Sequence, residues 1–129
     1  MNHAISARLF TLLSSGVVLV RLALVAGAPW GALTQGGRAP GTLPGTAREV
    51  AFVSAALLAW FIHVIRARAG SPPRFGRTAW IVVAYCALGM VANAATPSVP
   101  ERVLWLPVVT LMFATSLHVA LRSAPTGAA

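Results

Sequence analysis

The residue best placed to do chemistry in this 129-residue chain is Arg21, a cation inside the apolar run from Leu9 to Ala28. An arginine at membrane depth costs at least about 2.5 kcal/mol unless it is paired or solvated, and such residues commonly mark functional sites. The chain has two acidic residues, Glu49 and Glu101, and each stands just before a later apolar run. Because a guanidinium on a long side chain reaches several ångströms along its helix, we expect Arg21 to approach both carboxylates at one end of the molecule.

Other polar residues are expected at the same end. Asn93 lies near the end of the third apolar run, and Gln35 and Trp30 belong to the loop that follows the first. The predicted members of this outward-facing polar cluster, covered by residues 30–38, are Arg21, Glu49, Asn93, Glu101, Gln35 and Trp30. An arginine among loop amides suits a small anion or a carboxylate-bearing amphiphile. The alternatives are an ion pair that only fixes helix register, or an arginine that reaches out to the lipid headgroups.

Each glutamate also follows a hydroxyl residue by three positions. Thr46 precedes Glu49 and Ser98 precedes Glu101, in both cases just before an apolar run. This spacing is typical of a capping box, in which both side chains accept hydrogen bonds from unpaired amides at a helix start. We therefore predict a capping box at each site.

Two histidines form a second candidate site. His63 and His118 stand shortly before Arg66 and Arg122, at equal depth near the predicted cytoplasmic face. Two imidazoles from different helices are the minimal axial ligands of a b-type haem. A histidine at a helix C-terminus is better explained by its interaction with the helix dipole, and the chain lacks Cys-x-x-Cys and His-Glu-x-x-His motifs. We expect no metal or cofactor, with haem b on His63 and His118 as the alternative.

Catalytic chemistry has little support in the sequence. The chain contains no lysine and no aspartate, which excludes a P-loop, a Schiff-base lysine and an aspartyl dyad. Tyr85 and Cys86 lie in the middle of an apolar run, where a thiol is unreactive. We predict a non-catalytic binding or accessory component. The alternatives are a subunit of an oligomeric small-molecule transporter or channel, and a bis-histidine haem or redox protein.

The elements that must position these residues are four apolar segments. The predicted spans cover residues 8–28, 48–66, 78–95 and 100–121. Each is close to the roughly 20 helical residues that cross a hydrocarbon core about 30 Å thick. Charged residues make up 9% of the chain and the mean hydropathy is +0.78, whereas about a quarter of the residues of a soluble domain are charged. We predict an all-α integral membrane four-helix bundle of antiparallel up-down topology, forming a single domain over residues 1–129.

The first span resembles a secretory signal only in part. Small residues from Ala26 to Ala28 are typical of a cleavage site, but Arg21 interrupts the apolar stretch and Pro29 would follow the cut. We therefore expect the first span to be retained.

The arginines predict the orientation in the membrane. The basic loop 66–77 and the two ends of the chain carry six of them, namely Arg8, Arg66, Arg68, Arg74, Arg77 and Arg122. The opposite side, with the proline- and glycine-rich loop 29–47, carries three: Arg38, Arg48 and Arg102. The positive-inside rule therefore places both termini and the basic loop in the cytoplasm.

The same distribution bears on partners. The ten basic residues are all arginine and are scattered along the chain, whereas a nucleic-acid footprint requires a concentrated basic surface. We expect no nucleic acid. The expected partner is the lipid bilayer, and a membrane-protein partner or a second copy of the chain are open alternatives.

Two outer segments carry a family resemblance. The first is Trp30-Gly31-Ala32-Leu33-Thr34-Gln35-Gly36-Gly37, and the second is Asn93-Ala94-Ala95-Thr96-Pro97-Ser98 continuing into Glu101-Arg102 and Leu104-Trp105-Leu106-Pro107. They resemble a group of small four-span bacterial membrane proteins, over nearly the whole chain. The resemblance implies the four-span architecture and a bacterial inner-membrane location, and it implies no activity.

Overall fold

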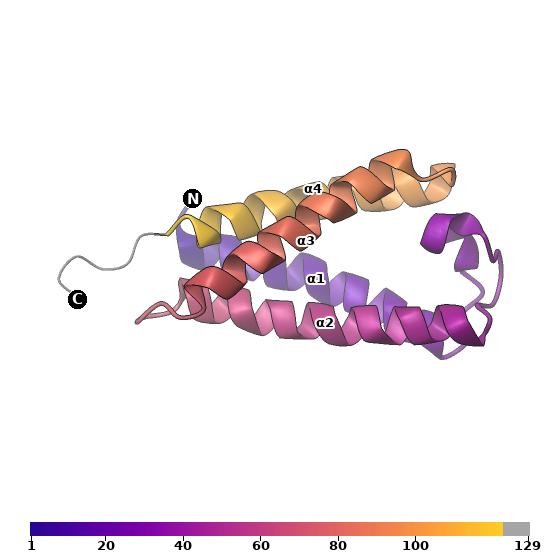
Figure 1. Cartoon of the computed structure of the whole chain (residues 1–129), viewed down its shortest axis with the longest axis horizontal. Helices are drawn as coiled ribbons and strands as arrows, with labels where there is room; N and C mark the ends of the chain where they lie inside the picture. Colours follow the sequence, from indigo (N-terminus) through magenta and orange to yellow (C-terminus); the bar gives the residue numbers. More distant parts are fainter. Residues whose placement is uncertain (123–129) are drawn as a thin grey trace.

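A computed structural model describes residues 1–122 and shows four long α-helices joined by loops (Figure 1). The helices are α1 (His3–Val25), α2 (Gly45–Ala69), α3 (Gly76–Ala95) and α4 (Val99–Ala120). Successive helices run in opposite directions, so the N-terminus and the end of α4 lie at one end of the bundle, here called the termini end. The opposite end, which holds residues 26–44 and the connection from α3 to α4, is the loop end.

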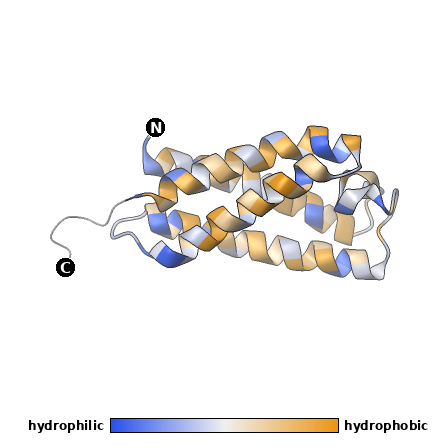
Figure 2. Ribbon diagram, turned by 45° about the horizontal axis from the view of Figure 1, so that its top comes forward, coloured by the Kyte–Doolittle hydropathy of each residue, from blue (hydrophilic) through white to orange (hydrophobic). Residues whose placement is uncertain are grey.

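All four helices are long and apolar enough to cross a membrane, with 23, 25, 20 and 22 residues in chain order. Hydrophobic residues dominate their middle sections (Figure 2). Large apolar side chains face outward, including Leu12 and Leu88, each 71% exposed, and Val103, 70% exposed. A soluble monomer rarely exposes so much apolar surface, whereas lipid is a suitable environment for it. The prediction of an all-α chain with four helices long and apolar enough to span a membrane is confirmed.

Helices α1 and α2 begin before the residues predicted from the sequence. Helix α1 begins at His3 because the Asn2 side chain accepts a hydrogen bond of 2.8 Å from the amide of Ile5. Helix α2 begins at Gly45, after Pro44, and has no side-chain cap. The predicted capping box of Thr46 and Glu49 is therefore wrong, because the helix has already begun before Thr46.

Most of the core lies toward the termini end. The largest fully buried side chains there come from all four helices: Phe10, Phe61, Ile65, Val82 and Val119. A smaller cluster of Leu24, Leu43 and Ala51 joins α1, α2 and the loop at the loop end. Helices α3 and α4 diverge from α1 and α2 toward the loop end (Figure 1). The main core therefore ends partway along the bundle, and a cavity separates the two helix pairs beyond it.

Ser98 caps α4 as the spacing predicts, since its hydroxyl accepts a hydrogen bond from the amide of Glu101 at 3.3 Å. The same hydroxyl donates to the carbonyl of Ala32 at 2.7 Å. The other half of the predicted box is wrong, because the Glu101 carboxylate binds donors in the two loops at the loop end and not the amide of Ser98.

We expect Ser98→Ala to lower the free energy of unfolding by about 2 kcal/mol, the sum of a lost helix cap and a lost hydrogen bond. The measurement is unfolding in mixed micelles of dodecyl maltoside and dodecyl sulfate. Thr46→Ala is the matched control, since Thr46 is exposed and α2 has no side-chain cap. Equal effects of the two substitutions would contradict the role of Ser98.

Candidate functional site

The loop between α1 and α2 is ordered and packs against the start of α4. It contains two short 3-10 helices, η1 (Gly31–Leu33) and η2 (Gln35–Gly37), and the amide of Gly31 donates to the carbonyl of Gly41 at 2.8 Å. Three hydrogen bonds join this loop to α4 and its cap: Ser98 Oγ to Ala32 O (2.7 Å), Trp105 Nε1 to Leu33 O (2.6 Å), and Gly36 N to Glu101 Oε2 (2.9 Å). The loop therefore covers the loop end of the bundle.

A cavity of about 710 Å³ lies beneath this loop, between the two helix pairs. Its volume falls within the range of about 300–1,000 Å³ found for small-molecule sites. The polar lining includes Arg21, Gln35, Arg38, Asn93, Thr96 and Glu101, and the apolar lining includes Val17, Leu58, Val108, Val109 and Met112. Val50 of α2 and Leu88 of α3 also line it and are 55% and 71% exposed. The cavity therefore opens sideways between α2 and α3.

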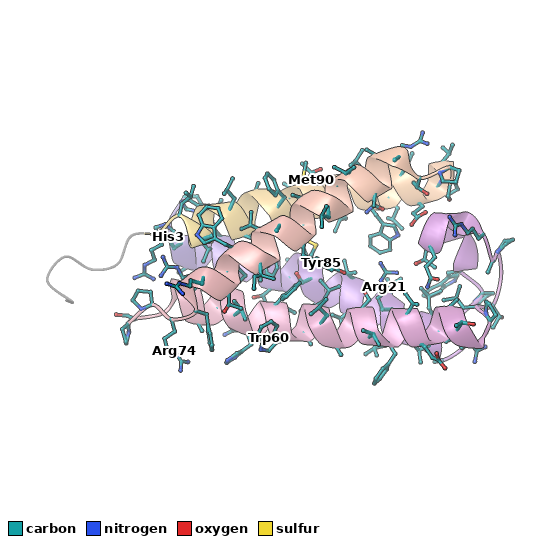
Figure 3. All side chains as sticks on the ribbon, in the orientation of Figure 1. His3, Arg21, Trp60, Arg74, Tyr85 and Met90 are labelled. Atoms are coloured by element: carbon teal, nitrogen blue, oxygen red, sulfur yellow. The ribbon has the colours of Figure 1, made fainter. Side chains whose placement is uncertain are left out.

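Arg21 reaches the cavity from α1. Figure 3 shows its side chain between the helix pairs, nearer the loop end than Tyr85. Its Nη1 donates to the hydroxyl of Thr34 at 2.6 Å, and Thr34 is almost fully buried. Within residues 1–122 this is the one hydrogen bond of the Arg21 side chain. Since a guanidinium carries five N–H donors, most of them remain available to a ligand in the cavity.

Glu101 has partners other than Arg21. Its Oε2 accepts hydrogen bonds from the amide of Gly36 at 2.9 Å and from the hydroxyl of Thr96 at 2.6 Å. The expected direct pairing of Arg21 with the two glutamates is therefore not seen. Arg21 and Glu101 line the same cavity and interact electrostatically across it. The carboxylate is satisfied by loop donors, which leaves the guanidinium without a carboxylate bonded to it.

An unusual backbone turn brings the Gly36 amide to Glu101. Gln35, Gly36 and Gly37 have consecutive positive φ angles of 50°, 76° and 68°. Glycine adopts this conformation freely, whereas glutamine rarely does. The Gln35 side chain donates to the carbonyl of Ala47 in α2 at 2.9 Å, and this bond helps to hold the strained residue in place. The turn is thus fixed from both sides of the cavity.

The structure brings together four of the six residues of the predicted cluster: Arg21, Gln35, Asn93 and Glu101 all line the cavity. The Asn93 amide group donates to the carbonyl of Gly89 in its own helix at 2.8 Å. Glu49 and Trp30 are exposed and lie outside the cavity lining. Helix α2 turns the row of Val50, Ser54 and Leu58 toward the cavity, and Glu49 is not on that row. Trp30 precedes η1 at the surface.

Sequence reasoning missed the hydroxyls that support the charged groups. Thr34 binds Arg21 and Thr96 binds Glu101, and both threonines are buried. Trp105 is a third such residue, since it lines the cavity and its indole N–H donates to the loop. All three occur in the two outer segments that carry the family resemblance, which is the one signal that could have indicated them.

The two candidate haem ligands have separate partners. His118 Nδ1 lies 2.6 Å from Ser6 Oγ, and its ring stacks on His3 with centroids 4.5 Å apart. His63 is exposed and lies edge-on to Phe75 at 5.7 Å. Within the described part of the chain, no group of three or more His, Cys, Asp or Glu side chains is arranged to hold a metal ion.

Comparison with protein-family models, with curated proteins and with solved structures finds no match to this chain. The four apolar helices fit a small polytopic membrane protein, and a cavity with both polar and apolar lining residues lies within its helical bundle. The residues of that cavity are therefore the basis for a functional proposal.

Proposed function

We propose that the protein binds the anionic headgroup of an amphiphile at Arg21 and acts as a non-catalytic binding component of the membrane. The observation that carries this proposal is a guanidinium inside the bundle whose one hydrogen bond within residues 1–122 is to the neutral hydroxyl of Thr34. A carboxylate or phosphate would accept the remaining donors, and such charge-assisted bonds are the strongest that a protein offers. The ligand would also offset the cost of placing an arginine at this depth.

The charges around the cavity favour an anion over a cation. Arg21 and Arg38 both line the cavity, against the single carboxylate of Glu101. That carboxylate already accepts two hydrogen bonds, from Gly36 and Thr96. A cationic headgroup would therefore meet two positive charges and a carboxylate that is already engaged, whereas an anionic headgroup would meet an arginine with available donors.

The apolar lining supports an alkyl chain attached to the headgroup. On α2 the lining runs from Val50 to Leu58, a distance of about 12 Å at 1.5 Å per helical residue. Exposed Val50 and Leu88 flank the opening between α2 and α3. An amphiphile could therefore place its head beside Arg21 and its chain toward this opening, entering from the surrounding lipid without crossing the loop.

We also propose that the protein lies in the inner membrane of a bacterium with both termini in the cytoplasm. The excess of arginines at the termini end supports this orientation through the positive-inside rule, and the resemblance of the outer segments supports the location. The loop end would then face outward, and the ligand would come from the outer leaflet.

The test uses decanoate at pH 8, where the carboxylate is ionised, and decanol as an uncharged probe of the same chain length. In a variant with Trp30, Trp60 and Trp80 replaced by phenylalanine, Trp105 reports directly on the cavity. The replaced residues are 44% to 46% exposed, so the core is left unchanged. We expect saturable fluorescence changes, with decanoate binding at least about 10-fold more tightly than decanol, since a hydrogen bond to a charged group contributes about 1.5–3 kcal/mol. Equal affinities would overturn the proposal.

A further inference from the structure

The arginines at the termini end have different structural roles. Arg68 donates to the carbonyl of Arg122, and Arg122 donates to the carbonyls of Ala69 and Gly70 at 2.5 and 2.9 Å. These two guanidinium groups join the end of α2 to the end of α4. They are engaged in holding the bundle together and are poorly placed to bind a ligand.

Arg8 and Arg66 differ from that pair. Both are exposed, and both line a groove of about 400 Å³ between the start of α1 and the end of α2. Within residues 1–122 neither side chain has a hydrogen-bond partner. The two glutamates, Glu49 and Glu101, lie toward the opposite end of the bundle, so within residues 1–122 no carboxylate lies near this groove.

Beyond Arg8 the groove is lined by two hydroxyl residues and one leucine of α1. Thr11 and Ser15 line it, and they stand three and seven residues after Arg8. At 1.5 Å per residue they lie about 5 and 10 Å deeper in the membrane than Arg8. Leu12 also lines the groove and is 71% exposed. The cations therefore lie nearer the end of the bundle than the hydroxyl and exposed apolar side chains, just as the phosphate of a membrane lipid lies outside its glycerol esters and acyl chains.

We propose that this groove binds the phosphodiester of an anionic glycerophospholipid from the leaflet at the termini end. Arg8 and Arg66 would hold the phosphate from two helices, since the guanidinium group matches phosphate geometry. Ser15 would donate to the ester carbonyl of an acyl chain, and the exposed side chain of Leu12 would contact the lipid beside it. This site is separate from the cavity at Arg21 and does not depend on the function proposed for that cavity.

The test compares dioleoyl phosphatidylglycerol with dioleoyl phosphatidylcholine, titrated separately into the detergent-purified full chain and detected by native mass spectrometry. An arginine near an anionic membrane surface contributes about fivefold in affinity, so two should give the anionic lipid an advantage of about 25-fold. We expect this advantage to fall to about twofold in Arg8→Gln/Arg66→Gln. Glycerol 3-phosphate, which has the phosphate without the chains, should bind weakly and compete poorly.

Two control variants separate a site from general charge attraction. Arg74→Gln/Arg77→Gln removes the same charge from the same end, and neither residue lines the groove; it should keep the full preference. Arg21→Leu should also keep it, because Arg21 lies in the other cavity. Should the double glutamine variant not fold, Arg8→Lys/Arg66→Lys keeps the charge and should lose part of the preference. The proposal is overturned if the wild type shows no preference, or if the Arg74 and Arg77 variant loses it equally.

Discussion

Replacing Arg21 with leucine is expected to lower the affinity for decanoate about 100-fold or more, while the folded protein becomes no less stable. Arg21 provides the guanidinium inside the cavity, and its loss would leave a bound carboxylate buried without a counterion. Leaving one partner of a buried charge pair alone costs about 3–5 kcal/mol, and each 1.4 kcal/mol corresponds to a factor of ten in affinity. The change is measured by Trp105 fluorescence.

Arg21→Leu should weaken ligand binding without lowering the stability of the folded protein. Leucine removes a cation from a membrane span, so insertion and thermal stability should be unchanged or improved. Arg38→Leu is the matched control, because Arg38 lines the same cavity but is exposed, and an exposed charge contributes little in water. It should weaken binding only a few-fold. Unchanged decanoate affinity in Arg21→Leu would show that Arg21 serves packing alone.

Gly31→Ala is expected to have the second large effect, the release of the loop from the loop end. A Cβ atom at Gly31 would lie 1.8 Å from the carbonyl oxygen of Ala39 and 2.7 Å from that of Gly41. Both contacts are to backbone, so the loop cannot accommodate the methyl group by turning a side chain. The Gly31–Gly41 hydrogen bond would be lost, and with it the positions of the residues that bond to α4.

Hydrogen exchange is the measurement for this variant. Overpacking at such a site costs about 3 kcal/mol, which corresponds to a loss of about 100-fold in the protection of the loop amides. Gly45→Ala provides the comparison, since a Cβ atom there meets no other atom within 4 Å. Loop amides that stay as protected in Gly31→Ala as in Gly45→Ala would show that the loop is not held as the structure indicates.

Much of the architecture followed from the sequence because its signals are local. The length and apolarity of each run are sufficient to indicate a membrane-crossing helix, and a single arginine within such a run stands out. Ser98 was identified as a cap because the capping signal spans only four residues, from Ser98 to Glu101. These features depend on the properties of a short segment and on no distant contact.

The partners of the charged groups could not be predicted in this way. Arg21 and Glu101 were expected to meet directly, but each binds a buried threonine, and Glu101 also binds the amide of Gly36. Those contacts depend on the left-handed turn at Gln35 and on how far α3 and α4 diverge from α1 and α2. Neither feature has a short-range sequence signal. The opposite charges of Arg21 and Glu101 suggested an ion pair, but in the folded protein each group is hydrogen-bonded to uncharged groups instead.

The hydrogen bonds between the first loop and α4 also constrain how the protein is made. Their partners are 65, 66 and 72 residues apart in the chain. During synthesis the first loop therefore emerges well before the segment on which it docks. The loop end can therefore be completed only after the start of α4 has been synthesised, which makes its assembly a late step in the biogenesis of the protein.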